Sequence, residues 1–203
     1  NGFLTHDVEQ RAGLFKGGLR AARHEGKRAA LRAADRLLAR ATAVRVATTE
    51  LSWTDETRTA PALPPPGPES ARAFEFPFFQ TDEGYHRAVE LRIAEGTWGE
   101  GPCTAWLRPR VALVEGEDTS QLERVLIAAD ATNGLAPTLP IHDYTFINPD
   151  LTVHLTRRLA GEWVGLAARS VPDPHGTGLV QGRVFDRDGE LGHCLQSLLV
   201  RPR

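Results

Sequence analysis

Three polar residues in the second half of the chain are of types that hold and activate a water molecule: Asp130, Asn133 and Gln196. Asp130 and Asn133 fall near the end of the segment DTSQLERVLIAADATNGL, and Gln196 interrupts the final apolar run. A carboxylate can take a proton from water, and an amide can hold the water or an oxygen that gains negative charge. These positions indicate a site for attack by water, which requires no covalent nucleophile.

Each of these residues can also have a purely structural role. Asp130 can be a solvated residue at a helix boundary, Gln196 a core amide bonded to neighbouring backbone, and Asn133 a helix-terminal residue that favours the left-handed conformation. His154 and His193 fit cross-strand packing or the surface. The sequence shows no HExxH or paired metal-ligand spacing and no GxSxG elbow, which argues against a metal site and a serine triad.

The segment that carries Asp130 has the strongest helical pattern in the chain. Asp118 and Gln121 stand at capping-box spacing, and Gly134 and Pro137 indicate an end. An apolar stripe follows at helical spacing, formed by Leu122, Val125, Leu126 and Ala129. The pattern predicts a helix from Asp118 to about Asn133, with this stripe packed against a sheet.

From residue 145 onward the pattern indicates strands. The runs FINPDLTVHL, GEWVGLAARSV, GLVQGRVFD and GELGHCLQSLLV are rich in apolar residues, and Asp188-Gly189 favours a tight hairpin between the last two. The final run is apolar on both faces, which predicts that both faces are covered. Upstream, YHRAVELRIAEG and CTAWLRPRVAL are two further strand candidates.

Residues 47–72 divide the chain. They are rich in Thr, Pro and acidic residues, and the three consecutive prolines at 64–66 force an extended path, so this segment is predicted to be a linker. Before it, LTHDVEQ, GLRAARHEGKR and AALRAADRLLARATAVRV are interpreted as three strands. The last of these runs is also rich in helix-forming Ala, Leu and Arg, so a helix is the alternative.

Composition excludes several classes of protein. A net charge of −2 over 203 residues indicates no nucleic-acid partner, and no apolar run is long enough to cross a membrane. Cys103 and Cys194 form no CxxC pair, so free thiols in a reducing compartment are expected, which indicates a cytoplasmic protein. The chain starts at Asn1 and lacks methionine, so we expect either an internal fragment or missing stretches.

The motifs INPDLTVHL, GEWVGL, FDRDGELG and QSLLVR resemble the C-terminal half of the acyl-CoA thioesterase II-like family, over residues 85–203. More weakly, HEGKRAALRAADRLLARATAVRV is similar to the last strands of that family's first hotdog. LLARATAVRV would then be the repeat counterpart of LGHCLQSLLVR. The resemblance implies an α+β double hotdog, in which an antiparallel sheet curled around a central helix occurs twice. Its parts would be an incomplete N-terminal hotdog over 1–46, the linker 47–72 and a C-terminal hotdog over 73–203.

The resemblance also implies an acyl-CoA thioesterase. In the family an aspartate near the end of the C-terminal hotdog helix, a threonine at the start of the next strand and a glutamine in the final strand orient the attacking water. Asp130 and Gln196 match the first and last positions. The threonine position falls on Phe146, so Thr145 and Asn148 are the candidate polar replacements. Asn148 shares the face of Phe146, whereas Thr145 points to the other face.

We expect Asn133, Phe146 and Arg157 to contact substrate, with Arg157 near the phosphates of coenzyme A or, alternatively, in a solvated turn. The resemblance implies no metal and no cofactor apart from the coenzyme A of the substrate. It also implies a homodimer or a higher oligomer. A non-catalytic acyl-CoA-binding or interaction module is the alternative that Phe146 supports. An enoyl-CoA hydratase-type hotdog is disfavoured, because no histidine follows Asp130 in ATNGLAP.

Overall fold

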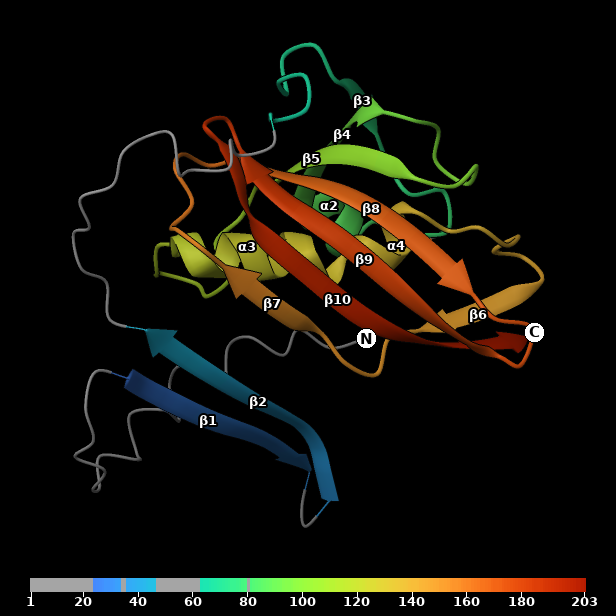
Figure 1. Ribbon diagram of the computed structural model, residues 1–203, viewed down its shortest axis with the longest axis horizontal. Coiled ribbons are helices and arrows are strands. Elements are labelled where there is room, and N and C mark those ends of the chain that lie inside the picture. Colours follow the sequence, from blue (N-terminus) through green and yellow to red (C-terminus); the bar gives the residue numbers. More distant parts are fainter. Residues whose placement is uncertain (1–23, 34–35, 47–62, 80) are drawn as a thin grey trace, which may run out of the picture. The chain divides into compact units, whose positions relative to one another are not determined.

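The computed structural model describes residues 24–33, 36–46, 63–79 and 81–203 (Figure 1). The chain divides into two compact units, Asn1–Thr59 and Ala60–Arg203. The described part of the first unit contains one hairpin, and the second unit contains all the other described elements. No helix in these ranges has the length and apolar character that a membrane crossing requires.

The hairpin of the first unit consists of β1 (His24–Ala33) and β2 (Arg36–Val46). The two strands pair antiparallel, with a register shift between Leu31 and Arg32. The extended conformation of this segment is confirmed and the helix alternative is wrong, because helix propensity is a weak preference that sheet pairing overrides. The predicted strand bounds are wrong, because the run 29–46 is divided between the end of β1 and the whole of β2. The predicted strand LTHDVEQ lies outside the described residues.

The second unit is built from eight strands and three short helices. In chain order they are β3 (Arg72–Phe74), α2 (Tyr85–Ala88), β4 (Val89–Glu95), β5 (Cys103–Pro109), α3 (Gln121–Asp130), α4 (Thr132–Leu135), β6 (Tyr144–Ile147), β7 (Thr152–Leu155), β8 (Val164–Pro172), β9 (Thr177–Asp186) and β10 (Gly189–Pro202).

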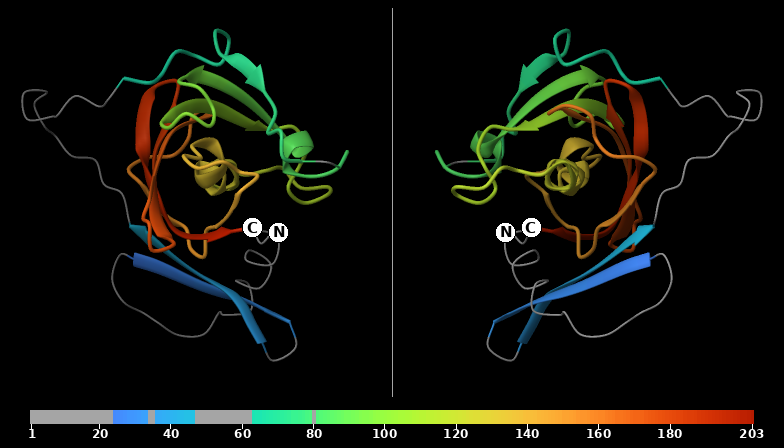
Figure 2. Two further views of the ribbon diagram at one scale, coloured as in Figure 1. Left: turned by 90° about the vertical axis from the view of Figure 1, so that its right-hand side faces the viewer. Right: turned by 90° about the vertical axis from the view of Figure 1, so that its left-hand side faces the viewer.

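These strands form one antiparallel sheet in the order β3-β4-β5-β8-β9-β10-β6, and β7 also pairs with β10. Figure 2 shows the sheet curling around α3, which lies on its concave side. The curled sheet around one helix is the arrangement predicted for the C-terminal half. The predicted hairpin is confirmed as well, because β9 and β10 pair from Asp186 opposite Gly189.

Helix α3 begins later than predicted. Its N-cap is Ser120, whose hydroxyl accepts the N–H of Glu123 while the Glu123 carboxylate accepts the N–H of Ser120. The capping box is therefore Ser120–Glu123, and the prediction of Asp118 and Gln121 is wrong. Leu122 lies in the first turn and is 51% exposed, so the predicted apolar stripe extends one turn too far. Three residues form the buried face: Val125, Ala128 and Ala129.

The C-terminal end of α3 also differs from the prediction. The helix ends at Asp130, and after Ala131 the short helix α4 continues to Leu135. Gly134 therefore lies inside α4 and does not terminate the predicted helix.

A glycine in β9 allows the helical segment to approach the sheet closely. A methyl group added at Gly182 would meet the Cys194 sulfur, and it would lie 2.9 Å from the Leu166 side chain and 3.1 Å from that of Thr132. Thr132 begins α4, and its hydroxyl lies 3.2 Å from the Cys194 sulfur. Cys103 and Cys194 are both buried free thiols. The close packing between α4, β9 and β10 therefore requires the absence of a side chain at residue 182.

Part of the predicted linker packs on the convex face of the sheet. The indole N–H of Trp106 donates to the carbonyl oxygen of Pro66 at 2.6 Å, and the Arg92 guanidinium donates to that of Pro68 at 2.9 Å. Pro68 is buried, and so is Phe185 on the same face as Trp106. Residues 66–68 thus cover this half of the convex face. The predicted domain boundaries at 47 and 72 stay a prediction.

The other half of the convex face remains exposed within this unit. Along β10 the side chains of Cys194, Gln196 and Leu198 are buried, whereas Leu195 points outward and is 41% exposed. Val171 and Leu179 on the neighbouring strands are also exposed. The prediction that a second sheet covers this face stays a prediction.

The packing at Gly182 leads to a test of stability. We expect Gly182→Ala to lower the free energy of unfolding by about 1–3 kcal/mol, because the added methyl group overpacks the contact between α4 and the sheet. Denaturant unfolding measures this change. Gly134→Ala is the matched control, since a methyl group there meets only Phe76, at 3.8 Å. Equal stabilities of the two variants would contradict this account.

Candidate functional site

The candidate site lies at the C-terminal end of α3. Asp130 is the last residue of this helix and is accessible to solvent. Its carboxylate Oδ1 accepts a hydrogen bond from the side-chain Nδ2 of Asn148 at 3.3 Å. Partial desolvation by surrounding protein atoms raises the pKa of Asp130, and the hydrogen bond from Asn148 opposes this increase. Such a carboxylate is a better proton acceptor than an ordinary exposed aspartate.

Gln196 joins the final strand to this helix end. Its side chain is fully buried, and its Oε1 accepts the backbone N–H of Asn133 at 3.1 Å. Its Nε2 donates to the backbone carbonyl of Asp130 at 3.2 Å, and more distantly to that of Ala129 at 3.5 Å. The interpretation of Gln196 as a satisfied core amide is therefore confirmed, and its hydrogen bond to Asp130 is with the backbone carbonyl rather than with the carboxylate. The water that the two residues were predicted to share stays a prediction.

A break in the edge strand brings Asn148 into the site. Both β6 and β7 pair with β10, but residues 148–151 between them do not. The carboxylate of Asp150 occupies this break and accepts the N–H of Ser197 at 2.7 Å and its hydroxyl at 2.8 Å. Because the Asp150 carboxylate binds the free backbone N–H at this point of β10, Asn148 does not have to pair with β10 and can turn towards Asp130.

The remaining residues predicted near this edge contribute in other ways. Phe146 packs against the buried residues Val180, Leu198 and Val200, so it fills the core beside the site. Thr145 lies opposite Arg201 in the β6–β10 ladder, and the described hydrogen bonds include none from its hydroxyl to Asp130. Their predicted roles in catalysis and substrate binding stay predictions.

Asn133 enters the site through its backbone, because its N–H binds Gln196. The described hydrogen bonds include none from its side chain. A contact between that side chain and substrate stays a prediction.

Tyr85 is a part of the site that the sequence analysis did not identify. Its hydroxyl donates to the backbone carbonyl of Ile127 at 2.9 Å, one turn before the end of α3. Burial raises the pKa of Tyr85, and the negative charge of Asp130 raises it further, so the phenol keeps its proton. Tyr85 comes from α2, and nothing in its local sequence relates it to residues 42 positions away.

Arg157 forms an ion pair that the sequence analysis did not predict. Its guanidinium binds both carboxylate oxygens of Asp186, at 2.5 and 2.6 Å, and also the carbonyl oxygen of Gly189. Burial alone would raise the pKa of Asp186, but hydrogen bonds from Arg157 and from the N–H groups of Ala160 and Asp188 outweigh burial and lower it. Arg157 lies in a bend and its side chain is 35% exposed, so both the solvated turn and binding of coenzyme A by Arg157 stay predictions.

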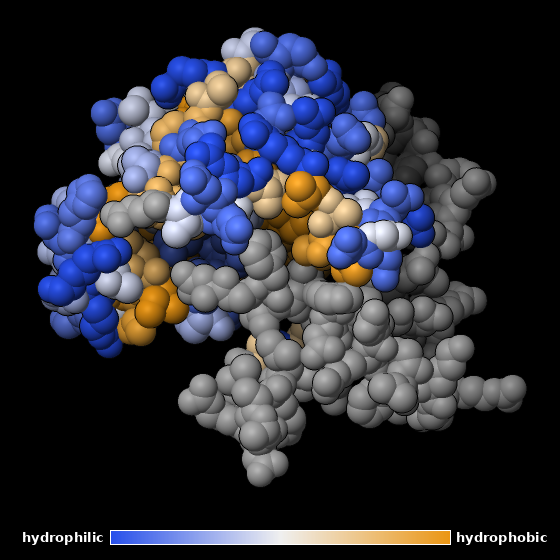
Figure 3. Space-filling view, turned by 180° about the vertical axis from the view of Figure 1, so that it is seen from behind, coloured by the Kyte–Doolittle hydropathy of each residue, from blue (hydrophilic) through white to orange (hydrophobic). Residues whose placement is uncertain are grey.

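An aromatic cluster lies beside the helix end. The ring centroid of Phe76 lies 5.8 Å from that of Phe74, 5.2 Å from that of Phe78 and 6.5 Å from that of Trp98. The indole N–H of Trp98 donates to the carbonyl oxygen of Gly134 at 2.8 Å. The run FEFPFF at 74–79 was an available signal for this cluster. Figure 3 shows the molecule from behind, with hydrophobic residues in patches between hydrophilic ones.

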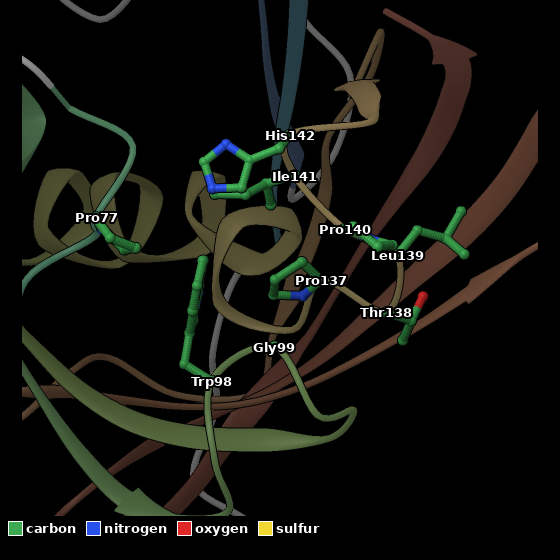
Figure 4. Close-up of a pocket in the computed structure, with 9 residues that line it drawn as sticks. All are labelled: Pro77, Trp98, Gly99, Pro137, Thr138, Leu139, Pro140, Ile141 and His142. Carbon is green, nitrogen blue, oxygen red and sulfur yellow. The ribbon is translucent and has the colours of Figure 1, made fainter.

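A hollow of about 350 Å³ lies next to this cluster, between Trp98 and the loop 137–142 (Figure 4). Pro77 and Trp98 stand on one side of it, and the side chains of the loop stand on the other. Its lining does not include Asp130, Asn148 or Gln196. Among the described residues no group of three His, Cys, Asp or Glu side chains is placed to hold a metal ion.

The comparisons with known proteins identify the family and the fold. Residues 59–200 match the family model described as "Acyl-CoA thioesterase C-terminal domain". No curated protein matches the chain. The structure is similar to an acyl-CoA thioesterase II of Mycobacterium marinum, with 15% identity and a TM-score of 0.65 over 91% of this chain and 71% of that one.

Two further solved structures are similar. The tesB protein of Mycobacterium avium subs paratuberculosis has 18% identity and a TM-score of 0.63, over 91% of this chain and 68% of that one. A hotdog-fold protein of Alicyclobacillus acidocaldarius has 15% identity and a TM-score of 0.61, over 91% and 69%. At these identities the likeness shows the hotdog fold alone.

The ion pair of Arg157 leads to a stability prediction. We expect Arg157→Ala to lower the free energy of unfolding by about 2–4 kcal/mol at neutral pH, because it leaves the buried Asp186 carboxylate without its counter-ion. The pKa of Asp186 is lowered in the folded state, so its contribution to stability is complete above the unfolded pKa of about 4 and is lost as the pH falls through the lower folded pKa.

Thermal or denaturant unfolding of wild type and variant between neutral and acid pH measures both effects. Arg158→Ala is the matched control, since Arg158 is exposed and its side chain forms no ion pair among the described residues. If Arg157→Ala and Arg158→Ala had equal stabilities, the pair with Asp186 would have no structural role.

Proposed function

Because the chain belongs to the family of acyl-CoA thioesterase C-terminal domains, we propose that it hydrolyses acyl-CoA thioesters to a free acid and coenzyme A. The observation that carries the proposal is the Asp130 carboxylate of raised pKa at the end of α3, held by Asn148. Three other features support it: the buried Gln196, the hotdog fold and the family match.

In the proposed reaction a water molecule is the nucleophile and Asp130 is the general base. Asp130 takes a proton from the water as the water oxygen forms a bond to the thioester carbonyl carbon, which gives a tetrahedral intermediate. The carbon–sulfur bond then breaks, and the proton passes to the departing coenzyme A sulfur. The raised pKa of Asp130 helps this proton transfer, because a base whose pKa lies closer to neutral pH accepts the proton of water more readily.

Asn148 is proposed to orient this base. Its amide binds Oδ1 of Asp130, and among the described residues Oδ2 has no hydrogen-bond partner, so Oδ2 is the oxygen that would receive the proton. Asn148 would thereby replace the polar group that Phe146 lacks. Gln196 would act as a positioning residue, because both ends of its amide bind the backbone at the helix end.

A double hotdog is the proposed architecture of the whole protein. The hairpin of β1 and β2 is the expected counterpart of the last two strands of the second unit, which also form an antiparallel hairpin. A sheet from the other half, or from a second copy in a homo-oligomer, would cover the exposed apolar residues Leu195, Leu179 and Val171. An experimental structure in which these residues stay exposed in the complete assembly would contradict this part of the proposal.

The first test of the function is Asp130→Asn, which keeps the shape of the side chain and removes the base. We expect kcat to fall by about 100-fold or more. The measurement is thiol release from short, medium, long and aromatic acyl-CoAs. Asp118→Asn is the matched control, because Asp118 is exposed and precedes the opposite end of the same helix. Full activity of Asp130→Asn would exclude Asp130 from the mechanism. No thiol release by the wild type would favour a binding module.

The second test uses the pH dependence. The hydrogen bond from Asn148 lowers the pKa of Asp130, so Asn148→Ala should raise this pKa further. A base must be ionised to act, and we therefore expect the acid limb of the kcat/KM profile to move to higher pH in Asn148→Ala. Gln181→Ala, which removes an exposed amide from the convex face, should leave the limb in place. An acid limb that is unchanged or moves to lower pH in Asn148→Ala would show that Asn148 does not act through Asp130.

A further inference from the structure

The hollow between Trp98 and the loop 137–142 suggests which acyl group the protein accepts. We propose that this hollow binds the acyl group of the substrate and that the preferred group is a compact aromatic one. The inference rests on the proposed thioesterase function and narrows it to a class of substrate. Four observations carry it: the chemistry of one wall, the rigidity of the other, the connection to Asp130 and the size of the space.

The first wall is the indole ring of Trp98, which is held from two directions. Its N–H donates to the carbonyl oxygen of Gly134, and its ring contacts Phe74 and Phe78 at centroid distances of 5.6 and 6.3 Å. The aromatic cluster thus fixes the orientation of a large flat surface next to the hollow. Aromatic rings attract one another beyond their area of burial when offset or edge-on, so such a wall favours an aromatic ligand.

The opposite wall is the loop 137–142, which reads PTLPIH. Pro137 and Pro140 have fixed backbone angles and no rotamers to lose on binding. Leu139 between them packs against Val180 and its neighbours in the core, which anchors the loop. A space between one held indole and two prolines is a preformed slot for a flat group.

The slot is connected to the candidate base by a short series of contacts. Trp98 binds the backbone at Gly134, and the adjacent residue Asn133 binds Gln196 through its N–H. Gln196 in turn binds the backbone carbonyl of Asp130. The wall of the slot and the base are therefore fixed to the same helical segment. The proposal places the thioester carbonyl beside Asp130 and the acyl group along this segment, towards Trp98.

The volume of the slot and the residues at its rim also favour a small aromatic group. A volume of about 350 Å³ is at the small end of ligand sites, which matches a single ring better than a long alkyl chain. Thr138 and His142 at the rim are exposed and could bind a polar substituent of the ring. The ligand class that fits all these features is a mono-aromatic acyl group such as phenylacetyl.

The experiment measures kcat/KM of the full chain for phenylacetyl-, hexanoyl- and acetyl-CoA. The main variant is Thr138→Phe, which places a ring in the slot from an exposed position and should not affect folding. Trp98→Ala is the second variant and removes one wall. Trp163→Ala is the matched control, because Trp163 stacks with Arg92 and Arg108 on the convex face and has no contact with the slot.

We expect the wild type to prefer phenylacetyl-CoA over hexanoyl-CoA by about two- to tenfold, the scale of an aromatic contact beyond its burial of apolar area. Thr138→Phe and Trp98→Ala should each remove this preference, and Thr138→Phe should lower kcat/KM for phenylacetyl-CoA by a larger factor than that for acetyl-CoA. Trp163→Ala should keep the preference. If Trp98→Ala loses all activity through damage to the helix end, Thr138→Phe still decides the question.

Two outcomes would overturn the inference while leaving the thioesterase function intact. One is a wild type that hydrolyses hexanoyl-CoA as well as phenylacetyl-CoA. The other is a Thr138→Phe variant in which hydrolysis of phenylacetyl- and acetyl-CoA changes by the same factor. Absence of hydrolysis with every thioester in the panel would instead overturn the proposed function itself, and this inference with it.

Discussion

The last four carbonyl groups of a helix have no partner within the helix, and this constraint organises the second unit around the end of α3. Here no glycine in the left-handed conformation supplies the partners, because Ala131 at the C-cap is right-handed helical. The four carbonyls instead receive hydrogen bonds in turn from the Tyr85 hydroxyl, the Ala131 N–H, the Thr132 hydroxyl and the Gln196 amide. Two of these donors come from elements distant in sequence. The helix end is thereby fixed to α2 on one side and to β10 on the other.

The position of Asp130 at this fixed helix end affects the pKa of its carboxyl group. The C-terminus of a helix carries partial negative charge, so an aspartate there stands where ionisation is least favoured, in the same direction as its desolvation. The only described side chain that offsets this effect with a hydrogen bond to the carboxylate is Asn148, from the edge of the sheet. Asn148 can reach Asp130 because the chain leaves the β10 edge at this point. Pro149 has no N–H to donate to a neighbouring strand, and the Asp150 carboxylate accepts the backbone N–H of Ser197 that a paired strand would otherwise bind. The break in the edge strand is thus part of the site.

Local patterns predicted the elements of this unit better than its contacts. Helical spacing identified α3, the dipeptide Asp188-Gly189 identified the β9–β10 hairpin, and alternation identified the face shared by Phe146 and Asn148. The capping box was misplaced by two residues because two overlapping pairs have suitable spacing, and side-chain geometry decides between them. The contacts of Tyr85 with α3, of Arg157 with Asp186 and of Trp106 with the proline segment join residues 29 to 42 positions apart. No local pattern encodes such pairs.

If the proposed function holds, the same helix end allows the proposed acyl slot and the proposed base to vary independently. Gln196 and Trp98 bind backbone groups at Asp130, Asn133 and Gly134, so neither depends on the side chains that occupy these positions. The proposed base is the side chain of Asp130, whereas the shape of the hollow depends on Trp98 and on the loop that follows α4. Under the proposal, substitutions in that loop would change which acyl group fits while the hydrogen bonds around Asp130 are kept. Backbone hydrogen bonds hold the helix end together, and side chains in separate segments line the hollow.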